Sequence, residues 1–250
     1  MGGPRCRGVL MALALGILGV PVGLHAQEES EAADGWHFSA TPWMWLLKLN
    51  GDLTVFGQES DVQVDTDLIL DALEFAWMSH LELGKGNVSF FMQPIIAKLS
   101  SEGTVQVPTV GPVDAEVDID NVFLDVGGAY RVAGPFEIVA GARYFSLDVT
   151  AQLEGLGEES RDTSWWNGFV GGRIRKDFND RWGVRLHGDV GFGDSDSNYM
   201  TQGVLQYHFN PRFSGNLGYK WLHDDIDPER RNIDWSSDWY GGVIGLTIRR

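Results

Sequence analysis

Two histidine motifs are the first places to look for chemistry in this sequence. His37-Phe38-Ser39 has the His-x-Ser spacing of some lipid hydrolases, but no partner acid can be identified for it. His223-Asp224-Asp225 has the acid and histidine groups used by aspartyl-type proteases, which also need a facing acidic pair to activate a water. No such pair can be chosen. Both motifs are therefore interpreted as ordinary strand residues, and the sequence predicts no catalytic residues and no enzyme activity.

Other site motifs are missing or incomplete. Asp194-Ser195-Asp196-Ser197-Asn198 begins like a calcium loop, but Tyr199 stands where glycine is required and Leu205 where the last acidic ligand is required. There is no phosphate loop, no nucleophile elbow and no zinc-binding helix motif. We therefore predict no cofactor and no metal site. Paired glycines at 127–128, 171–172 and 241–242 are interpreted as strand glycines that allow close packing.

Charged residues recur on one face of alternating segments, and Trp182–Phe192 shows the pattern best. Its even-numbered residues are apolar or glycine, and its odd-numbered residues include Arg185, His187 and Asp189. A period of two indicates a strand with one apolar and one polar face. On the polar faces of this and the other strands, the sequence predicts an interlocked ion-pair network inside a barrel: Asp125, Arg143, Arg173, Arg185, His187, Asp189 and Lys220. Buried charges persist only when they are paired and hydrogen-bonded.

The start of the chain has the features of an export signal. Arg5 and Arg7 precede an apolar run at 9–20, and Leu24-His25-Ala26 supplies a cleavage site, so residues 1–26 are predicted to be a signal peptide. Removing both arginines leaves 19 − 2 = 17 basic against 35 acidic residues, a net charge of −18. That charge excludes a nucleic-acid binder. The single cysteine, Cys6, lies in this leader, so the mature chain has no disulfide.

The rest of the chain predicts one domain. Residues 27–35 form a polar tail, and residues 36–250 contain about ten strands, with eight or twelve left open. Four tight turns, at 84–87, 133–135, 179–181 and 210–212, alternate with five longer connections, at 50–73, 100–114, 154–161, 193–198 and 224–234. Within the first long connection we expect a small hairpin and a short helix at 67–73. This all-β layout is typical of an antiparallel up-and-down transmembrane β-barrel with short periplasmic turns and longer outer loops.

The longer connections are rich in aspartate and glutamate, whereas basic residues gather near the tight turns. The first interpretation is that acidic loops keep the outer mouth soluble. The second is that their oxygen ligands bind divalent cations near anionic lipid headgroups. Outer-membrane lipids are the expected partners in either case, and the oligomeric state is left open.

Ala40-Thr41-Pro42-Trp43-Met44-Trp45, the Gly141-Ala142-Arg143-Tyr144 strand and an aromatic-rich last strand resemble the small outer-membrane β-barrels of Gram-negative bacteria, the OmpA-like, OmpX-like and OmpW-like group. The resemblance implies an outer-membrane location. It departs at the C-terminus, which ends Ile248-Arg249-Arg250 and not with an aromatic residue.

The sequence favours an integral outer-membrane barrel with a structural or narrow porin-like role. In a barrel of so few strands, side chains are expected to fill the lumen. One alternative is a soluble periplasmic barrel of the lipocalin kind that binds an apolar ligand, which requires Val184, Leu186 and Val190 to point inward. The other is an outer-membrane lipid or peptide hydrolase that uses His37 or His223.

Overall fold

The structure is a computed structural model that describes residues 35–55, 58–107, 111–153, 155, 157–226 and 234–250. Alternating apolar and polar residues produce long strands over most of this chain. The elements are β1 Trp36–Val55, β2 Gln58–Val64, α1 Thr66–Ala72, β3 Leu73–Lys85, β4 Val88–Val107, β5 Gly111–Ala133, β6 Phe136–Leu153, β7 Gly157–Asp177, β8 Trp182–Gly193, β9 Ser197–His208, β10 Phe213–Ile226 and β11 Asp234–Arg249.

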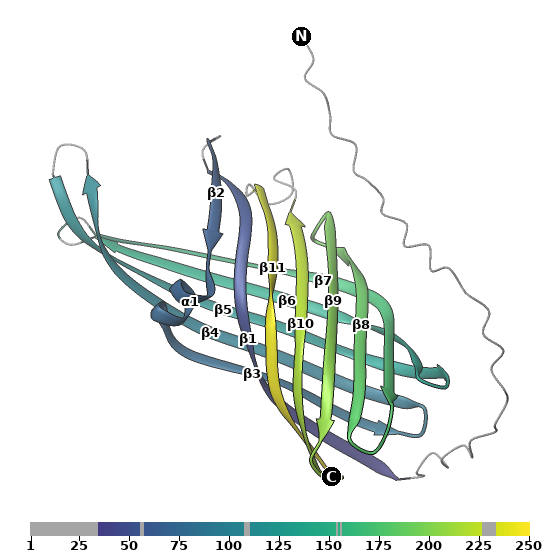
Figure 1. The fold of residues 1–250 in the computed structure, drawn as a ribbon. Helices are drawn as coiled ribbons and strands as arrows, with labels where there is room; N and C mark the ends of the chain where they lie inside the picture. The colour runs from purple at the N-terminus through teal and green to yellow at the C-terminus, as the bar shows by residue number, and fades with distance from the viewer. Residues whose placement is uncertain (1–34, 56–57, 108–110, 154, 156, 227–233) are drawn as a thin grey trace, which may run out of the picture. The chain divides into compact units, whose positions relative to one another are not determined.

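Ten of these strands close into a ring (Figure 1). From β3 to β11 each strand pairs antiparallel with the next, and β11 pairs with β1 along almost its whole length. β1 in turn pairs with β3, which completes the barrel. β2 pairs with β1 outside the ring. The predicted ten-stranded antiparallel barrel is confirmed.

The predicted connections need two corrections. The connection expected to begin at residue 50, where the Asn50-Gly51 pair favours a turn, begins later, because β1 continues to Val55 and pairs with β2, which begins at Gln58. Several predicted outer loops are instead strand extensions: β4 and β5, for example, remain paired out to Val107 and Gly111. Backbone pairing continues there although the side-chain alternation that marks a membrane span has ended. The expected helix is present as α1, and the predicted leader lies outside the described residues.

The two faces of the barrel differ as the alternation predicts. Large apolar side chains point outward, and Leu217 and Val190 keep 64% and 58% of their surface exposed. Charged side chains such as Asp189 and Arg143 point inward and are buried. Leu186 is also exposed, at 43%, so the inverted arrangement that a soluble lipocalin-like barrel requires is contradicted.

Aromatic pairs mark both ends of the apolar exterior. Trp182 and Tyr207 lie 4.8 Å apart, centroid to centroid, near the short turns, a side that we call the short-turn end. Tyr199 and Trp221 lie 5.1 Å apart near the opposite, outer end. Aromatic girdles of this kind flank the apolar band of membrane barrels. None of the described helices has the length and apolar character that a membrane crossing would need.

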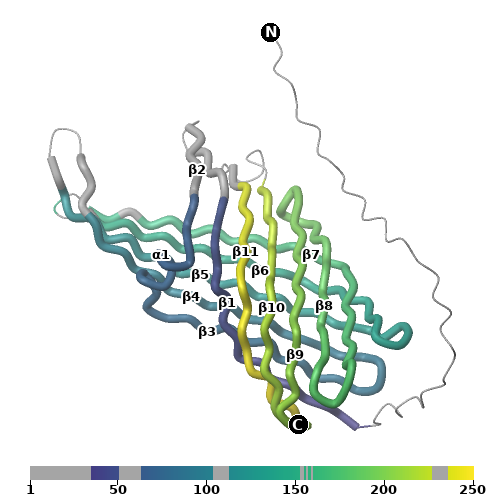
Figure 2. The backbone as a smooth tube through the Cα atoms, in the orientation of Figure 1, coloured from purple at the N-terminus to yellow at the C-terminus, as the bar shows by residue number. Residues whose placement is uncertain are grey.

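One part of the ring is incomplete. β1 pairs with β3 only over Trp36–Pro42 and with β2 only from Leu49, so in the described chain Trp43–Lys48 has a strand partner on the β11 side alone. The helix α1 follows β2 and leads into β3, and the Thr66 hydroxyl donates to the Leu47 carbonyl at 2.9 Å. The tube in Figure 2 shows β1 and β3 diverging near α1. We call this interval the β1–β3 seam.

Candidate functional site in the barrel lumen

Arg143 on β6 is the centre of one inward-facing charge cluster. Its Nε donates to Asp125 Oδ1 at 2.8 Å, and its Nη2 donates to Asp189 Oδ2 at 3.1 Å. His187 lies 2.7 Å from the same Asp189 oxygen. The Nη1 atom of Arg143 reaches across the lumen to Asn198 Oδ1 at 2.6 Å, and none of the arginine is exposed. We call these residues the Arg143 cluster.

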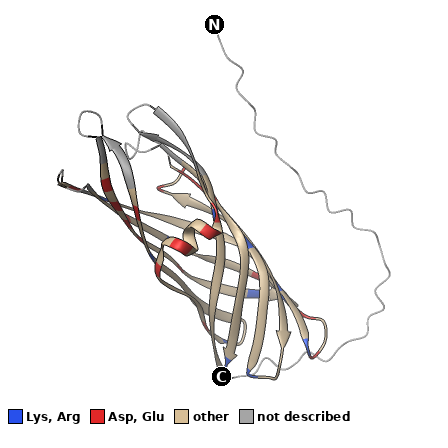
Figure 3. Cartoon of the chain, turned by 60° about the vertical axis from the view of Figure 1, so that its left-hand side comes forward, with Lys and Arg blue, Asp and Glu red and all other residues tan. Residues whose placement is uncertain are grey.

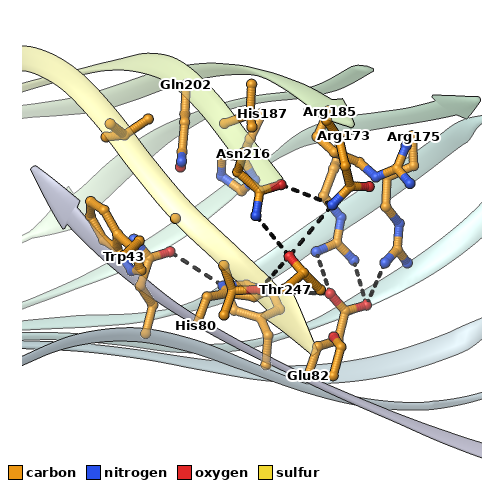
Figure 4. Close-up of a pocket in the computed structure, with 18 of the residues that line it drawn as sticks. Trp43, His80, Glu82, Arg173, Arg175, Arg185, His187, Gln202, Asn216 and Thr247 are labelled. Carbon is orange, nitrogen blue, oxygen red and sulfur yellow. Dashed lines mark hydrogen bonds and ion pairs between the residues drawn. The ribbon is translucent and has the colours of Figure 1, made fainter. Parts of the chain in front are cut away.

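A second cluster lies nearer the short-turn end (Figure 4). Arg173 donates to Glu82 Oε2 at 3.1 Å and to Glu137 Oε2 at 2.7 Å. Arg175 donates to the other oxygen of each carboxylate, at 2.8 Å and 2.6 Å. Two arginines and two glutamates on strands β3, β6 and β7 therefore bond one another in every arginine–glutamate combination, and we call them the Arg173 cluster. Neither glutamate is among the network residues predicted from the sequence, although each has the inward parity of its strand.

The remaining two predicted network residues join neither cluster. Arg185 donates to Asp177 at 2.9 Å, at the short-turn end. Lys220 is fully buried, and its Nζ lies 4.9 Å from the ring centroids of both Trp45 and Phe123 without any hydrogen-bond partner in the structure. The single network expected from the sequence is therefore two clusters, one rim pair and one ammonium held among aromatic rings. Strand tilt places these residues at different depths in the barrel, which the alternation of one strand does not reveal.

An aromatic and aliphatic layer fills the lumen on the outer side of Lys220. Phe145 stacks on Trp165 with ring centroids 4.9 Å apart, and Phe123 meets Phe145 edge-on at 4.8 Å. The full buried set is Trp45, Ile95, Phe123, Phe145, Trp165, Met200, Leu222, Ile226 and Val243. These residues have the inward parity of their strands, and that signal could have identified them from the sequence.

Between the two clusters and the short-turn end lies a cavity of about 200 Å³. Apolar side chains lining it include Trp43, Phe91 and Phe169. Four arginines also line it: Arg173, Arg175, Arg185 and Arg249. Figure 4 shows the first three of these side chains gathered on one side of the cavity, with Trp43 and His80 on the other.

The two histidine motifs lie at opposite ends of the barrel wall. His37 lies at the short-turn end of β1 against Gly84, and it makes no ion pair with any described carboxylate. His223 lies 3.0 Å from Asp238 and stacks on Tyr199, on the outward face of β10 and away from the lumen. Asp224, the next residue, points inward and accepts hydrogen bonds from Trp165 and Ser195. The two neighbours therefore lie on opposite sides of the barrel wall.

Within the described residues, no three histidine, cysteine, aspartate or glutamate side chains are grouped so that they could hold a metal ion. Divalent-cation binding by the acidic loops stays a prediction. Figure 3 shows acidic residues on α1 and on strands toward the outer end.

No protein-family model matches the chain, and no curated protein matches it. Similar solved structures include the translocator domain of autotransporter NalP from Neisseria meningitidis, which is 11% identical, with 88% of this chain and 90% of that chain covered and a TM-score of 0.47. The attachment invasion locus protein Ail of Yersinia pestis is 10% identical, with 87% and 99% covered and a TM-score of 0.37. The CymD monoaromatic hydrocarbon channel is 9% identical, with 86% and 88% covered and a TM-score of 0.39.

Likenesses at this level say nothing about ligand or role, so the class of protein follows from the structure itself. A closed antiparallel ring leaves the membrane almost no unpaired strand edge, and only helices and closed barrels can span a bilayer. The exterior is apolar between aromatic girdles, and the interior is charged. These features define an outer-membrane β-barrel.

Proposed function

We propose that this protein is a non-catalytic integral outer-membrane protein whose barrel is closed across its middle, so that its role is structural. The observation that carries the proposal is the filled lumen. Arg143 and Lys220 have no exposed surface, and the layer of Phe145, Trp165 and Leu222 lies directly beyond them. Narrow barrels leave room mainly for side chains.

A narrow conduit is the second candidate, and the cavity near the short-turn end favours it. That cavity already forms the inner half of a path, so only the Arg143 cluster and the aromatic layer would have to move. The two candidates differ in one measurable quantity, the ionic conductance of a single barrel.

Planar-bilayer recordings on the purified protein test the proposal. We expect no stable conductance steps from the wild-type barrel. The double variant Phe145→Ala and Leu222→Ala removes two fully buried side chains from the layer and should produce steps. Phe192→Ala, which removes an exposed aromatic side chain from the outer wall, is the matched control and should stay closed. Steady wild-type steps would reject the structural role in favour of the conduit.

The location and the lack of catalysis need separate tests. We expect the mature protein to start near residue 27 and to fractionate with the outer membrane, and recovery as a soluble periplasmic protein would contradict this. His37 and His223 are the residues to replace if any lipid or peptide hydrolysis is detected. Their alanine variants should hydrolyse no less than the wild type, since His223 meets a single carboxylate, Asp238, outside the lumen, and His37 forms no ion pair with a described carboxylate.

A further inference from the structure

One of the arginines that line the lumen cavity forms no ion pair with a described carboxylate. Arg173 and Arg175 bond Glu82 and Glu137, and Arg185 bonds Asp177. The fourth lining arginine is Arg249. It donates to Ser214 Oγ at 2.6 Å and to Gln206 Oε1 at 2.9 Å, and it forms no ion pair with any described residue.

The two neutral partners of Arg249 occupy only some of its N–H donors. A guanidinium carries five N–H donors in a planar fork, and two of the donors of Arg249 are occupied. Arg185 and Arg175 line the same cavity but are paired with carboxylates, so Arg249 carries the uncompensated positive charge among these three arginines. Guanidinium groups match carboxylate and phosphate geometry better than any other cationic side chain.

The far side of the cavity also has donors without acceptors. Trp43 lines the cavity, and its Nε1 atom is buried without a hydrogen-bond partner. Its ring lies 5.3 Å from Lys220 Nζ, which is likewise buried and unpartnered, as is Trp45 Nε1. Among the described residues, Asp189 Oδ1 is the one buried side-chain acceptor that also lacks a hydrogen-bond partner. A buried polar group without a partner is costly. Of these four groups in the described part of the chain, Trp43 is the one that lines the cavity, so the cavity wall itself presents an unmet donor and no unmet acceptor of this set.

We propose that this cavity is a binding site for a small oxyanion, a phosphoryl or carboxylate group, that enters from the short-turn end. Arg249 supplies the charge-assisted hydrogen bonds, and Trp43 supplies a further donor from the opposite side of the cavity. A cation is disfavoured, because the carboxylates of Glu82 and Asp125 at the cavity are each already bonded by an arginine. The cavity volume of about 200 Å³ exceeds the roughly 30 Å³ share of a water molecule several times over, so such a group fits with bound water.

The site is independent of whether the barrel conducts. A closed barrel has the cavity as a blind pocket, and a conducting barrel has it as an inner vestibule. Conductance recordings therefore do not test this proposal. It is tested by the anion-binding measurement described next.

The test uses the complete barrel in detergent micelles, titrated with inorganic phosphate and separately with acetate, at an ionic strength held constant with chloride. Binding is followed by tryptophan fluorescence and, for phosphate, by ³¹P line width. We expect saturable binding of at least one of the two anions, and which one binds identifies the phosphoryl or the carboxylate source. Arg249→Gln should weaken it about tenfold or more, since hydrogen bonds to a charged group are among the strong ones.

Arg250→Gln is the matched control, because it removes the neighbouring arginine, which is exposed. It should bind like the wild type. If Arg249→Gln does not fold, as judged by heat-modifiable gel mobility, Arg249→Lys keeps the charge but loses the fork and should still bind more weakly than the wild type. The proposal is overturned if the wild type shows no saturable binding of either anion. It is also overturned if the Arg249 variants bind as well as the Arg250 variant.

Discussion

At the scale of single residues, Arg143 is the side chain on which the lumen depends most. Replacing it with methionine leaves Asp125 and Asp189 buried without their cation. We expect Arg143→Met to lower the free energy of unfolding by about 3–5 kcal/mol. Urea unfolding in detergent or lipid, followed by tryptophan fluorescence, measures this loss.

Arg131 provides the comparison for that experiment. It also bonds a carboxylate, Glu137, but at 3.4 Å and with 42% of its side chain exposed. Exposed ion pairs contribute about 0–1 kcal/mol, so Arg131→Met should change the unfolding free energy little. Equal losses in the two variants would mean that burial does not decide the strength of these pairs.

The sequence predicts which residues face the lumen, but not which partners they meet. The parity of Arg143 and Asp189 follows directly from their strands. The bond from Arg143 on β6 to Asn198 on β9 does not, because it joins non-adjacent strands across the lumen. Such contacts depend on the tilt and curvature of the closed ring, which no single strand encodes. Lys220 is a second case, because its parity is clear from the sequence while its aromatic surroundings are not.

At the scale of elements, inward-facing glycines set how closely β5, β6 and β7 pack. A Cβ atom on Gly141 would lie 2.6 Å from Phe169 Cζ and 2.8 Å from the Cα of Gly127. Gly141→Ala should therefore cost about 1–3 kcal/mol through overpacking. The same urea unfolding measurement applies.

Gly172 on β7 is the control glycine. Its nearest neighbour to an added Cβ would be Glu137 O at 3.9 Å, an ordinary contact. Gly172→Ala should be tolerated, and a loss as large as that of Gly141→Ala would refute the packing explanation. Gly172 belongs to one of the paired glycines that are recognisable in the sequence, whereas Gly141 stands alone. The lack of space at Gly141 is visible only when the facing ring of Phe169 is in place.

Strand ends are the elements least predictable from the sequence. The alternation of Trp182–Phe192 gives β8 almost to the residue. The strand β1, by contrast, passes through Asn50-Gly51 without turning, because partners on both sides, β2 and β11, satisfy its backbone. Local turn propensity is overridden there by strand pairing that comes from distant parts of the chain.

At the scale of the whole molecule, the lipid-facing wall makes the outer-membrane class testable. Leu217 lies midway between Phe213 and Trp221 on the outward face of β10 and is 64% exposed. An arginine near the bilayer midplane costs about 2–4 kcal/mol, so Leu217→Arg should lower stability in lipid by that amount. Leu217→Phe should be tolerated. A tolerated arginine would show that this wall does not face lipid.

The architecture as a whole is the part that the sequence predicts best. Ring size, strand direction and the sidedness of the turns follow from repeated alternation and from four tight turns, and the structure confirms them. The incomplete β1–β3 seam is not predictable in this way. Pro42 has no N–H to donate, which fits a strand edge, but the continuous apolar run of Trp43–Leu47 after it does not show how far the pairing is missing.

That seam makes the wall uneven in its resistance to local opening. Trp43–Lys48 of β1 is hydrogen-bonded to β11 alone, and the part of β3 before Ser79 is hydrogen-bonded to β4 alone. A seven-residue helix, α1, lies between the two strands in sequence at this interval. Segments with fewer backbone partners open at lower free energy than the global transition. Among the amides within the membrane band, those of Trp43–Lys48 should therefore exchange hydrogen fastest. If thermal fluctuation separates two neighbouring strands of the barrel, we expect the separation to begin between β1 and β3.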